Sequence, residues 1–196
     1  MGLSSLSVSE VSANQEAGQS LTNELIALGA LAAGLIVFAI AAPTSYQLYL
    51  MLHIFFATVW VGGGTVIAIL AFMLSRERDP VQIGRFGAMT EKIGLRVFVP
   101  SSLVVLALGF VLMHKASWGY GHFWVIFALI GWAVSFCVGL FVLTPLAKRV
   151  AEVVPQRGIE DPEAQALLRR IITIDRWQVL VLLLVVADMA AKPFSG

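Results

Sequence analysis

Long apolar stretches alternate with short polar ones along this chain. Five apolar segments are long enough, or nearly so, to cross the roughly 30 Å hydrocarbon core of a bilayer as helices. They run from Leu25 to Ala42, Tyr46 to Leu74, Val97 to Met113, Phe123 to Leu146 and Ile171 to Ala190. The pattern predicts an all-α fold, a polytopic bundle of five transmembrane helices. Residues 25–194 are expected to form one domain.

The composition agrees with a chain whose main solvent is lipid. Hydrophobic residues make up 59% of the 196 residues and charged residues only 13%. Soluble domains carry about 25% charged residues, so the deficit predicts an integral membrane protein in contact with the lipid bilayer. The net charge of +1 argues against nucleic acid as a partner, and the single cysteine, Cys137, excludes an intrachain disulfide.

The first apolar segment has two interpretations. Its N-terminal position and the following Ala41, Ala42 and Pro43 are compatible with a cleaved signal peptide. A signal peptide begins with basic residues, however, and residues 1–24 contain three glutamates and no Lys or Arg. We therefore expect a retained helix preceded by a disordered or surface tail at 1–24.

The distribution of cations predicts the orientation. Cytoplasmic loops retain Lys and Arg, and two segments are rich in them, 76–96 and 148–170. Both should be cytoplasmic, so the N-terminus lies inside and the C-terminus outside a multi-pass protein of the inner (cytoplasmic) membrane. Within these segments Pro80 and Asp161–Pro162 predict the starts of short helices, the first lying at the membrane surface.

One histidine lies inside the second apolar segment. On a wheel with 100° per residue, His53 shares a face with Trp60 and Gly64 and with further small residues. Small residues mark the places where helix backbones approach closely, and Gly62, Gly63 and Gly64 are expected to permit this. His53 should therefore face the bundle interior, in the outer half of the membrane.

Other polar residues are expected at the same level. The third segment ends at Met113 and His114, the fourth begins after His122, and the fifth ends near Asp188 and Lys192, which are one helical turn apart. Asp188 is interpreted as the only deeply placed carboxylate. Ionisable groups inside membrane spans are costly and commonly functional, so the sequence predicts a polar site centred on His53.

Structural explanations stay open for each of these residues. His53 can be a neutral packing residue, and His114 and His122 can belong to the aromatic belt at the interface. Asp188 can pair with Lys192 as an anchor at the helix end. Met51 and Met113 also lie near this level, where methionine commonly serves packing.

Four sequence segments resemble a family of small bacterial integral membrane proteins of unknown function. They are "LHIFFATVWVGGG", "RVFVPSSLVVLALGFVLM", "WGYGHFWV" and "LLLVVADMAAKPF". The first also resembles the histidine span of CopD-type copper membrane proteins and of the membrane protoporphyrinogen oxidase that carries haem b. The resemblance covers residues 46–194, which implies a four-helix core to which the first span is added.

The resemblance to the oxidase implies that His53 ligates haem, and that Lys192, Pro193 and Phe194 match its C-terminal motif. The oxidase also has an essential lysine early in the span after its "WLH" motif. This chain has no Lys or Arg between His122 and Lys148, so it lacks that residue. The copper family contributes a match at His53 and at the Trp60–Gly63 signature.

Three classes of function follow, and no catalytic residue is assigned. The first is a haem-b-binding redox protein, with a site drawn from His53, Trp60, Gly64, His114, His122, Asp188 and Lys192. The second is a copper-binding or copper-transport protein, with donors among His53, Met51, Met113 and His114. The third is a cofactor-free accessory subunit, which would contact a second copy or another membrane subunit through small-residue helix faces.

Overall fold

A computed structural model describes Ile26, residues 33–34, Val37, Ile40 and residues 44–193. The chain divides into two units, Met1–Leu48 and Tyr49–Gly196. In the first unit Ile26, Ala33, Gly34, Val37 and Ile40 are helical. The rest of the predicted first span, the tail at 1–24 and the predicted domain boundary between them lie outside the described residues.

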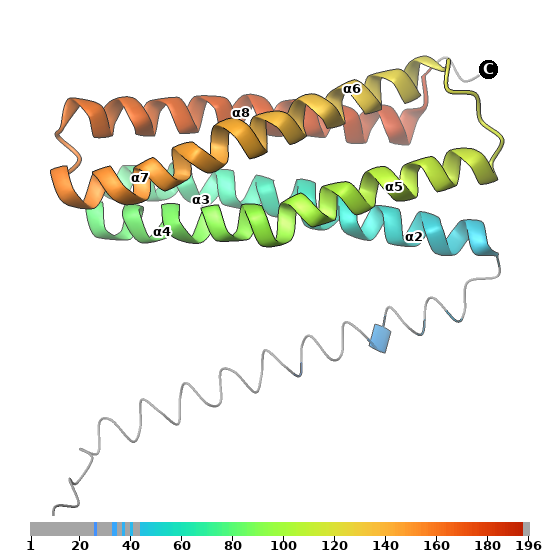
Figure 1. The fold of residues 1–196 in the computed structure, drawn as a ribbon, viewed down its shortest axis with the longest axis horizontal. Helices are drawn as coiled ribbons and strands as arrows, with labels where there is room; N and C mark the ends of the chain where they lie inside the picture. The colour runs from blue at the N-terminus through green and yellow to red at the C-terminus, as the bar shows by residue number, and fades with distance from the viewer. Residues whose placement is uncertain (1–25, 27–32, 35–36, 38–39, 41–43, 194–196) are drawn as a thin grey trace, which may run out of the picture. The chain divides into compact units, whose positions relative to one another are not determined.

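Four long helices follow, three of them interrupted by a short π-helical segment (Figure 1). The first long helix comprises α2 (Ser45–Ala57), η1 (Thr58–Gly62) and α3 (Gly63–Glu77). The second comprises α4 (Pro80–Ile93), η2 (Gly94–Phe98) and α5 (Val99–Lys115). The third comprises α6 (Phe123–Val138), η3 (Gly139–Leu143) and α7 (Thr144–Arg157), and the fourth is α8 (Pro162–Ala191).

Successive helices run antiparallel, and their connections gather at two ends of the bundle (Figure 1). The turns before α4 and α8 lie at one end, and the loop between α5 and α6 lies at the other. Asp79 caps α4 by accepting hydrogen bonds from the backbone N–H groups of Val81 (2.9 Å) and Gln82 (3.2 Å). Asp161 caps α8 in the same way, so the predicted helix starts at Pro80 and Pro162 are confirmed.

Both basic segments lie at the end where α4 and α8 begin. Exposed ion pairs join side chains there, Arg78 with Glu160 at 2.7 Å and Arg157 with Glu163 at 2.7 Å. Pairs of this kind contribute little to stability, about 0–1 kcal/mol each. Their common location agrees with the prediction that both basic segments face the same side of the membrane. Which side that is stays a prediction.

Three helices of the described part are long and apolar enough to span a membrane: Ser45–Glu77, Pro80–Lys115 and Phe123–Arg157. The predicted fifth span lies in α8, which is not among them, because Asp175, Arg176 and Asp188 interrupt its apolar sequence. The predicted number of five transmembrane helices is therefore not confirmed. The all-helical architecture is confirmed for the described residues, which contain no strand.

The spans are longer than the sequence predicted. With 33 to 36 residues each, these helices extend about 50 Å, whereas the hydrocarbon core is roughly 30 Å thick. The residues by which these helices exceed the hydrocarbon core lie largely in the basic segments. In the second long helix, for example, α4 continues through η2 into α5. The prediction of a separate surface helix after Pro80 is wrong. The face of α4 that contains Ile83 and Gly87 is buried against α7 and needs no membrane surface, whereas Met89 is exposed.

The packing of α4 on α7 explains this extension. A hydrophobic cluster joins α4, α7 and α8 at the basic end; its buried members are Ile83, Leu146, Val150, Val154, Ala164 and Leu167. Gly87 brings the two backbones together, since a Cβ added there would lie 2.9 Å from the carbonyl oxygen of Ala147. Burial of this apolar surface makes α4 part of the bundle.

Candidate functional site

His53 lies on α2 with its imidazole directed at α5. A Cβ added at Gly109 would be 3.5 Å from Cε1 and 4.0 Å from Nδ1 of His53. The carbonyl group of Val105, one turn before Gly109 on α5, also interacts with the ring. The histidine therefore faces a neighbouring helix inside the bundle, as the sequence predicted.

The imidazole is not fully satisfied by the protein. Nδ1 of His53 is buried and makes no hydrogen bond of regular geometry to any described residue. Because Gly109 has no side chain, nothing on that turn of α5 shields the Val105 carbonyl from the ring. In the tautomer with a proton on Nδ1, this nitrogen can donate only to an acceptor on that side, where the Val105 carbonyl lies, and the lone pair of Nε2 is left for another partner.

The prediction that Trp60 and Gly64 share an inward face with His53 is only partly correct. Trp60, in η1, is buried and packs with Val61 and Leu182 at the centre of the bundle, not against His53. Gly63 makes the close approach, since a Cβ there would lie 2.8 Å from Phe98, whereas Gly64 has open space beside it. The reason is η1: a π-helical segment changes the angular spacing of residues, so a wheel at 100° per residue cannot follow the face across it.

A second group of polar atoms lies at the end of the bundle opposite the basic segments. Asp188 is buried, and its Oδ2 has no hydrogen-bond partner among the described residues; the same is true of Nε1 of Trp124. Lys192 does not pair with Asp188. Its Nζ lies 3.9 Å from the centroid of the Trp118 ring and 5.5 Å from that of Trp124, so it makes cation–π contacts.

The predicted ion pair between Asp188 and Lys192 is therefore absent from the structure. The cause is local backbone geometry. Lys192 terminates α8 in a left-handed conformation (φ 44°), with its N–H donating to the carbonyl of Asp188 at 2.7 Å. Leaving the helix there moves the Lys192 side chain off the face that Asp188 occupies and toward the two tryptophans.

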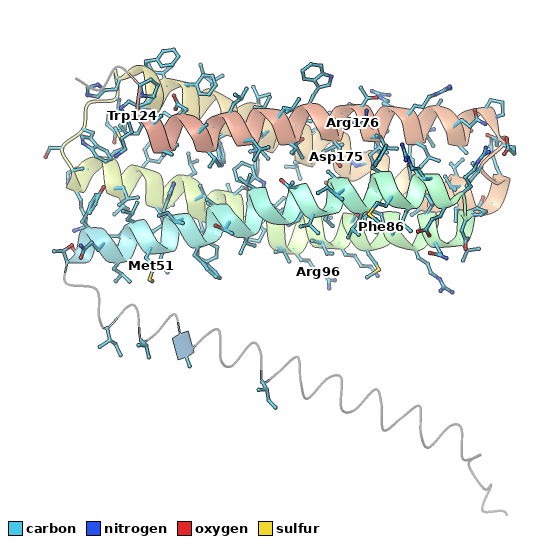
Figure 2. The ribbon with its side chains drawn as sticks, turned by 180° about the vertical axis from the view of Figure 1, so that it is seen from behind. Met51, Phe86, Arg96, Trp124, Asp175 and Arg176 are labelled. Carbon is cyan, nitrogen blue, oxygen red and sulfur yellow. The ribbon has the colours of Figure 1, made fainter. Side chains whose placement is uncertain are left out.

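The remaining predicted residues are dispersed. His114 is exposed, and His122 stacks on Trp124 with ring centroids 6.4 Å apart, as expected for an aromatic belt. Met113 is buried against Trp124 and Val125. Met51 lies on the outer side of α2 in Figure 2, away from the other helices. Among the described residues no group of three or more His, Cys, Asp or Glu side chains is placed to hold a metal ion.

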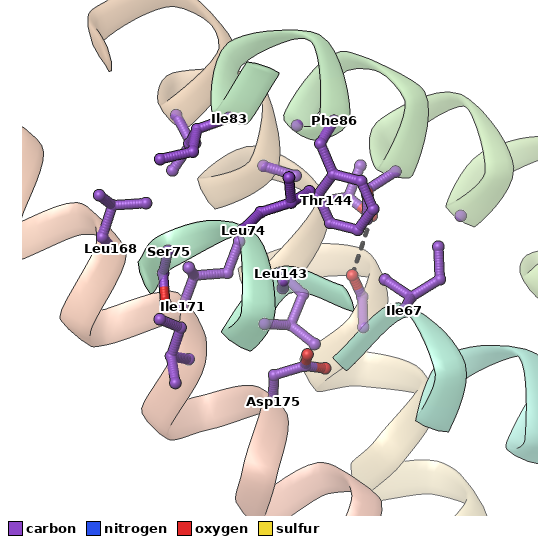
Figure 3. A pocket seen from close by; sticks show the side chains of 18 residues that line it. Ile67, Leu74, Ser75, Ile83, Phe86, Leu143, Thr144, Leu168, Ile171 and Asp175 are labelled. Carbon is purple, nitrogen blue, oxygen red and sulfur yellow. Dashed lines mark hydrogen bonds between the residues drawn. The ribbon is translucent and has the colours of Figure 1, made fainter. Parts of the chain in front are cut away.

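One functional candidate was missed by the sequence interpretation. Asp175, on α8, directs its carboxylate into a cavity of about 110 Å³ near the basic end (Figure 3). Asp188 is therefore not the only deeply placed carboxylate. The signal was available, because Asp175 falls inside the predicted span from Ile171 to Ala190, where any carboxylate is unusual.

Fold and composition together define this protein as an integral membrane protein whose described part is helical and contains three helices long and apolar enough to cross a bilayer. Residues 47–193 match the family model described as predicted integral membrane protein (DUF2269), and the chain belongs to this family. The match carries no relationship to copper-handling proteins or to protoporphyrinogen oxidase. No match was found among curated proteins or among solved structures.

Proposed function

We propose that this protein is a membrane redox protein that binds haem b through His53. The observation that supports the proposal best is the partly buried imidazole of His53, whose Nδ1 is buried without a hydrogen-bond partner among the described residues and lies on the side of the Val105 carbonyl. Metal-ligating histidines commonly donate their second ring N–H to a backbone carbonyl, which fixes the tautomer and makes the other nitrogen a better ligand. Bound haem would supply one-electron chemistry.

The roles of the neighbouring residues follow from their positions. Gly109 gives the ring room to rotate, and Val105 would hold the Nδ1 proton. Trp60 contacts the central hydrophobic cluster rather than the imidazole, so we assign it to packing. His114, His122, Asp188 and Lys192 are assigned to the rim of the bundle, because none of them contacts His53.

The test is an absorbance spectrum of the protein purified in detergent, before and after addition of haemin. Wild type is expected to give a Soret band that shifts on reduction. His53→Ala should lose the band while retaining its helical circular dichroism and elution volume. His114→Ala and His122→Ala are matched controls, since each removes an imidazole at the same end of the bundle, and both should retain the band.

Two results would overturn the proposal. One is a wild-type protein without a Soret band even after addition of haemin. The other is a band of equal intensity in His53→Ala, which would assign the haem to a different ligand.

Copper binding is the second candidate, and the register of α5 favours it, although the Met113 side chain packs against Trp124 and Val125. Met113 is buried on α5 four residues after Gly109, on the same face as the residue that contacts His53. An imidazole with a thioether is a donor set that Cu(I) accepts. Metal analysis after exposure to Cu(I) should then give one copper per protein in wild type and less than half in Met113→Leu. Protein with neither haem nor copper would favour an accessory subunit.

A further inference from the structure

The cavity that contains Asp175 lies well away from His53, toward the basic end of the bundle. All four long helices contribute to its wall, and most of the wall is aliphatic or aromatic. The larger apolar side chains in this wall are those of Ile67, Leu74, Ile83, Phe86, Leu143 and Ile171. Figure 3 shows Asp175 at one end of the pocket, with Leu143 beside its carboxylate and Phe86 and Ile83 at the opposite side. An ionised carboxylate is costly in such surroundings unless a cation or hydrogen-bond donors accompany it.

Among the described residues no cation pairs with Asp175. Arg176 is the next residue, but its guanidinium is exposed and lies 5.1 Å from the centroid of the Phe72 ring. The ion pairs Arg78–Glu160, Arg149–Glu163 and Arg157–Glu163 lie toward the basic end and do not include Asp175. The carboxylate is thus left for a partner from outside the chain.

Two further polar atoms in this part of the bundle can accept a hydrogen bond and have no partner among the described residues. Oγ1 of Thr90, in the wall of the cavity, is buried without a hydrogen-bond partner. Oε1 of Gln178, one turn after Asp175 on α8, is buried without one as well. The hydroxyls of Ser75 and Thr144 already donate to the carbonyls of Phe72 (2.7 Å) and Gly139 (2.9 Å).

We propose that this cavity binds a small primary ammonium ion with an apolar body. An ammonium group carries one positive charge and three N–H donors, which match the Asp175 carboxylate and the unpartnered oxygen of Thr90. The apolar body would lie among the aliphatic side chains of the wall. A bare metal cation fits worse, since Ca²⁺ takes six to eight oxygen ligands and Mg²⁺ takes six.

The volume limits the size of the ligand. An engineered apolar cavity of about 150 Å³ holds benzene. A cavity of about 110 Å³ therefore suits a molecule with somewhat fewer heavy atoms, such as isobutylamine. The π-helical segment η3 forms part of the wall through Gly139 and Leu143, and π-helical segments are frequent at functional sites.

The experiment is calorimetric titration of isobutylamine at pH 7 into the protein in lipid nanodiscs, with empty nanodiscs as the blank. Isobutanol has the same body without the charge and is the matched control ligand. The amine should bind wild type at least 10-fold more tightly than the alcohol does. Asp175→Asn, which keeps the shape of the side chain, should bring the amine to the affinity of the alcohol.

Two further variants separate the carboxylate from the space around it. Thr90→Val should weaken amine binding about 3-fold, as expected for the loss of one hydrogen bond. Ala71→Leu retains Asp175 but fills part of the cavity, so it should abolish binding of both ligands. Ala71→Leu decides the matter alone if Asp175→Asn does not fold, with folding judged by helical circular dichroism and elution volume.

Several outcomes would overturn the proposal. These are absence of amine binding to wild type, equal affinities for amine and alcohol, and amine binding that survives both Asp175→Asn and Ala71→Leu. The last would assign the heat to a different site on the protein, since the empty nanodiscs account for partition into lipid. Neither the haem spectrum nor the His53 variants enter this test, so its result is independent of the proposed function.

Discussion

The contact of α4 with α7 makes a sharp prediction for one glycine. In Gly87→Ala the new Cβ would lie 2.9 Å from the carbonyl oxygen of Ala147 and 3.2 Å from the backbone nitrogen of Ala151. Both atoms belong to the α7 backbone, so no side-chain rotation can relieve the contact. The two helices must move apart, and overpacking of this kind costs about 1–3 kcal/mol.

The intrinsic helix preference acts in the opposite direction. Alanine favours a helix over glycine by about 0.5–1 kcal/mol, so Gly87→Ala should be destabilised by a net ~0.5–2 kcal/mol. Gly64→Ala is the matched control, since no atom lies within 4 Å of its Cβ position. It should gain up to ~1 kcal/mol. At about 2–4 °C per kcal/mol for a domain of this size, the melting temperatures should change in opposite directions.

Thermal unfolding in one detergent, followed by tryptophan fluorescence at a fixed scan rate, measures the difference. A thiol-reactive dye is unsuitable because Cys137 is exposed in the folded protein. The reasoning is refuted if Gly87→Ala melts at or above the wild-type temperature. It is equally refuted if Gly64→Ala loses as much stability as Gly87→Ala, since the backbone contact would then not be the cause.

Four more predictions concern the ends of the bundle. Asp161→Ala removes the cap of α8 and should cost about 1 kcal/mol in thermal unfolding, whereas Asp161→Asn should cost much less. The backbone N–H groups of Gln82 and Val81 lower the pKa of Asp79, so its stabilising contribution is complete above about pH 4 and is lost as the pH falls through the folded-state pKa. The melting-temperature difference between wild type and Asp79→Asn should accordingly be constant at neutral pH and change only in acid. Alkaline phosphatase fused after Gly196 should be active and the same fusion in the α7–α8 turn inactive; the reverse result would invert the orientation. Because Lys192 contacts two tryptophans and not Asp188, Asp188→Asn and Lys192→Met should be additive within about 0.5 kcal/mol, and a larger coupling in a double-mutant cycle would restore the ion pair.

Local signals in the sequence were sufficient for the helix starts and for the class of protein. An Asp–Pro pair marks the first turn of α4 and of α8, because the carboxylate caps free N–H groups and proline lacks one. The apolar content predicts a membrane protein, because lipid replaces water as solvent for most side chains. The inward direction of His53 agrees with the prediction, although Trp60 and Gly64, which were used to define its face, lie in and after η1, across which the regular helical period does not hold.

Only the tertiary structure decided which of these residues meet. The basic segment after Pro80 reads as an amphipathic surface helix until α7 is present to cover its apolar face. Whether Gly63 or Gly64 contacts a neighbour depends on η1, and whether Lys192 meets Asp188 or two tryptophans depends on where α8 ends. The cavity around Asp175 is drawn from four helices distant in sequence, and no periodicity within one helix encodes a space that its neighbours enclose.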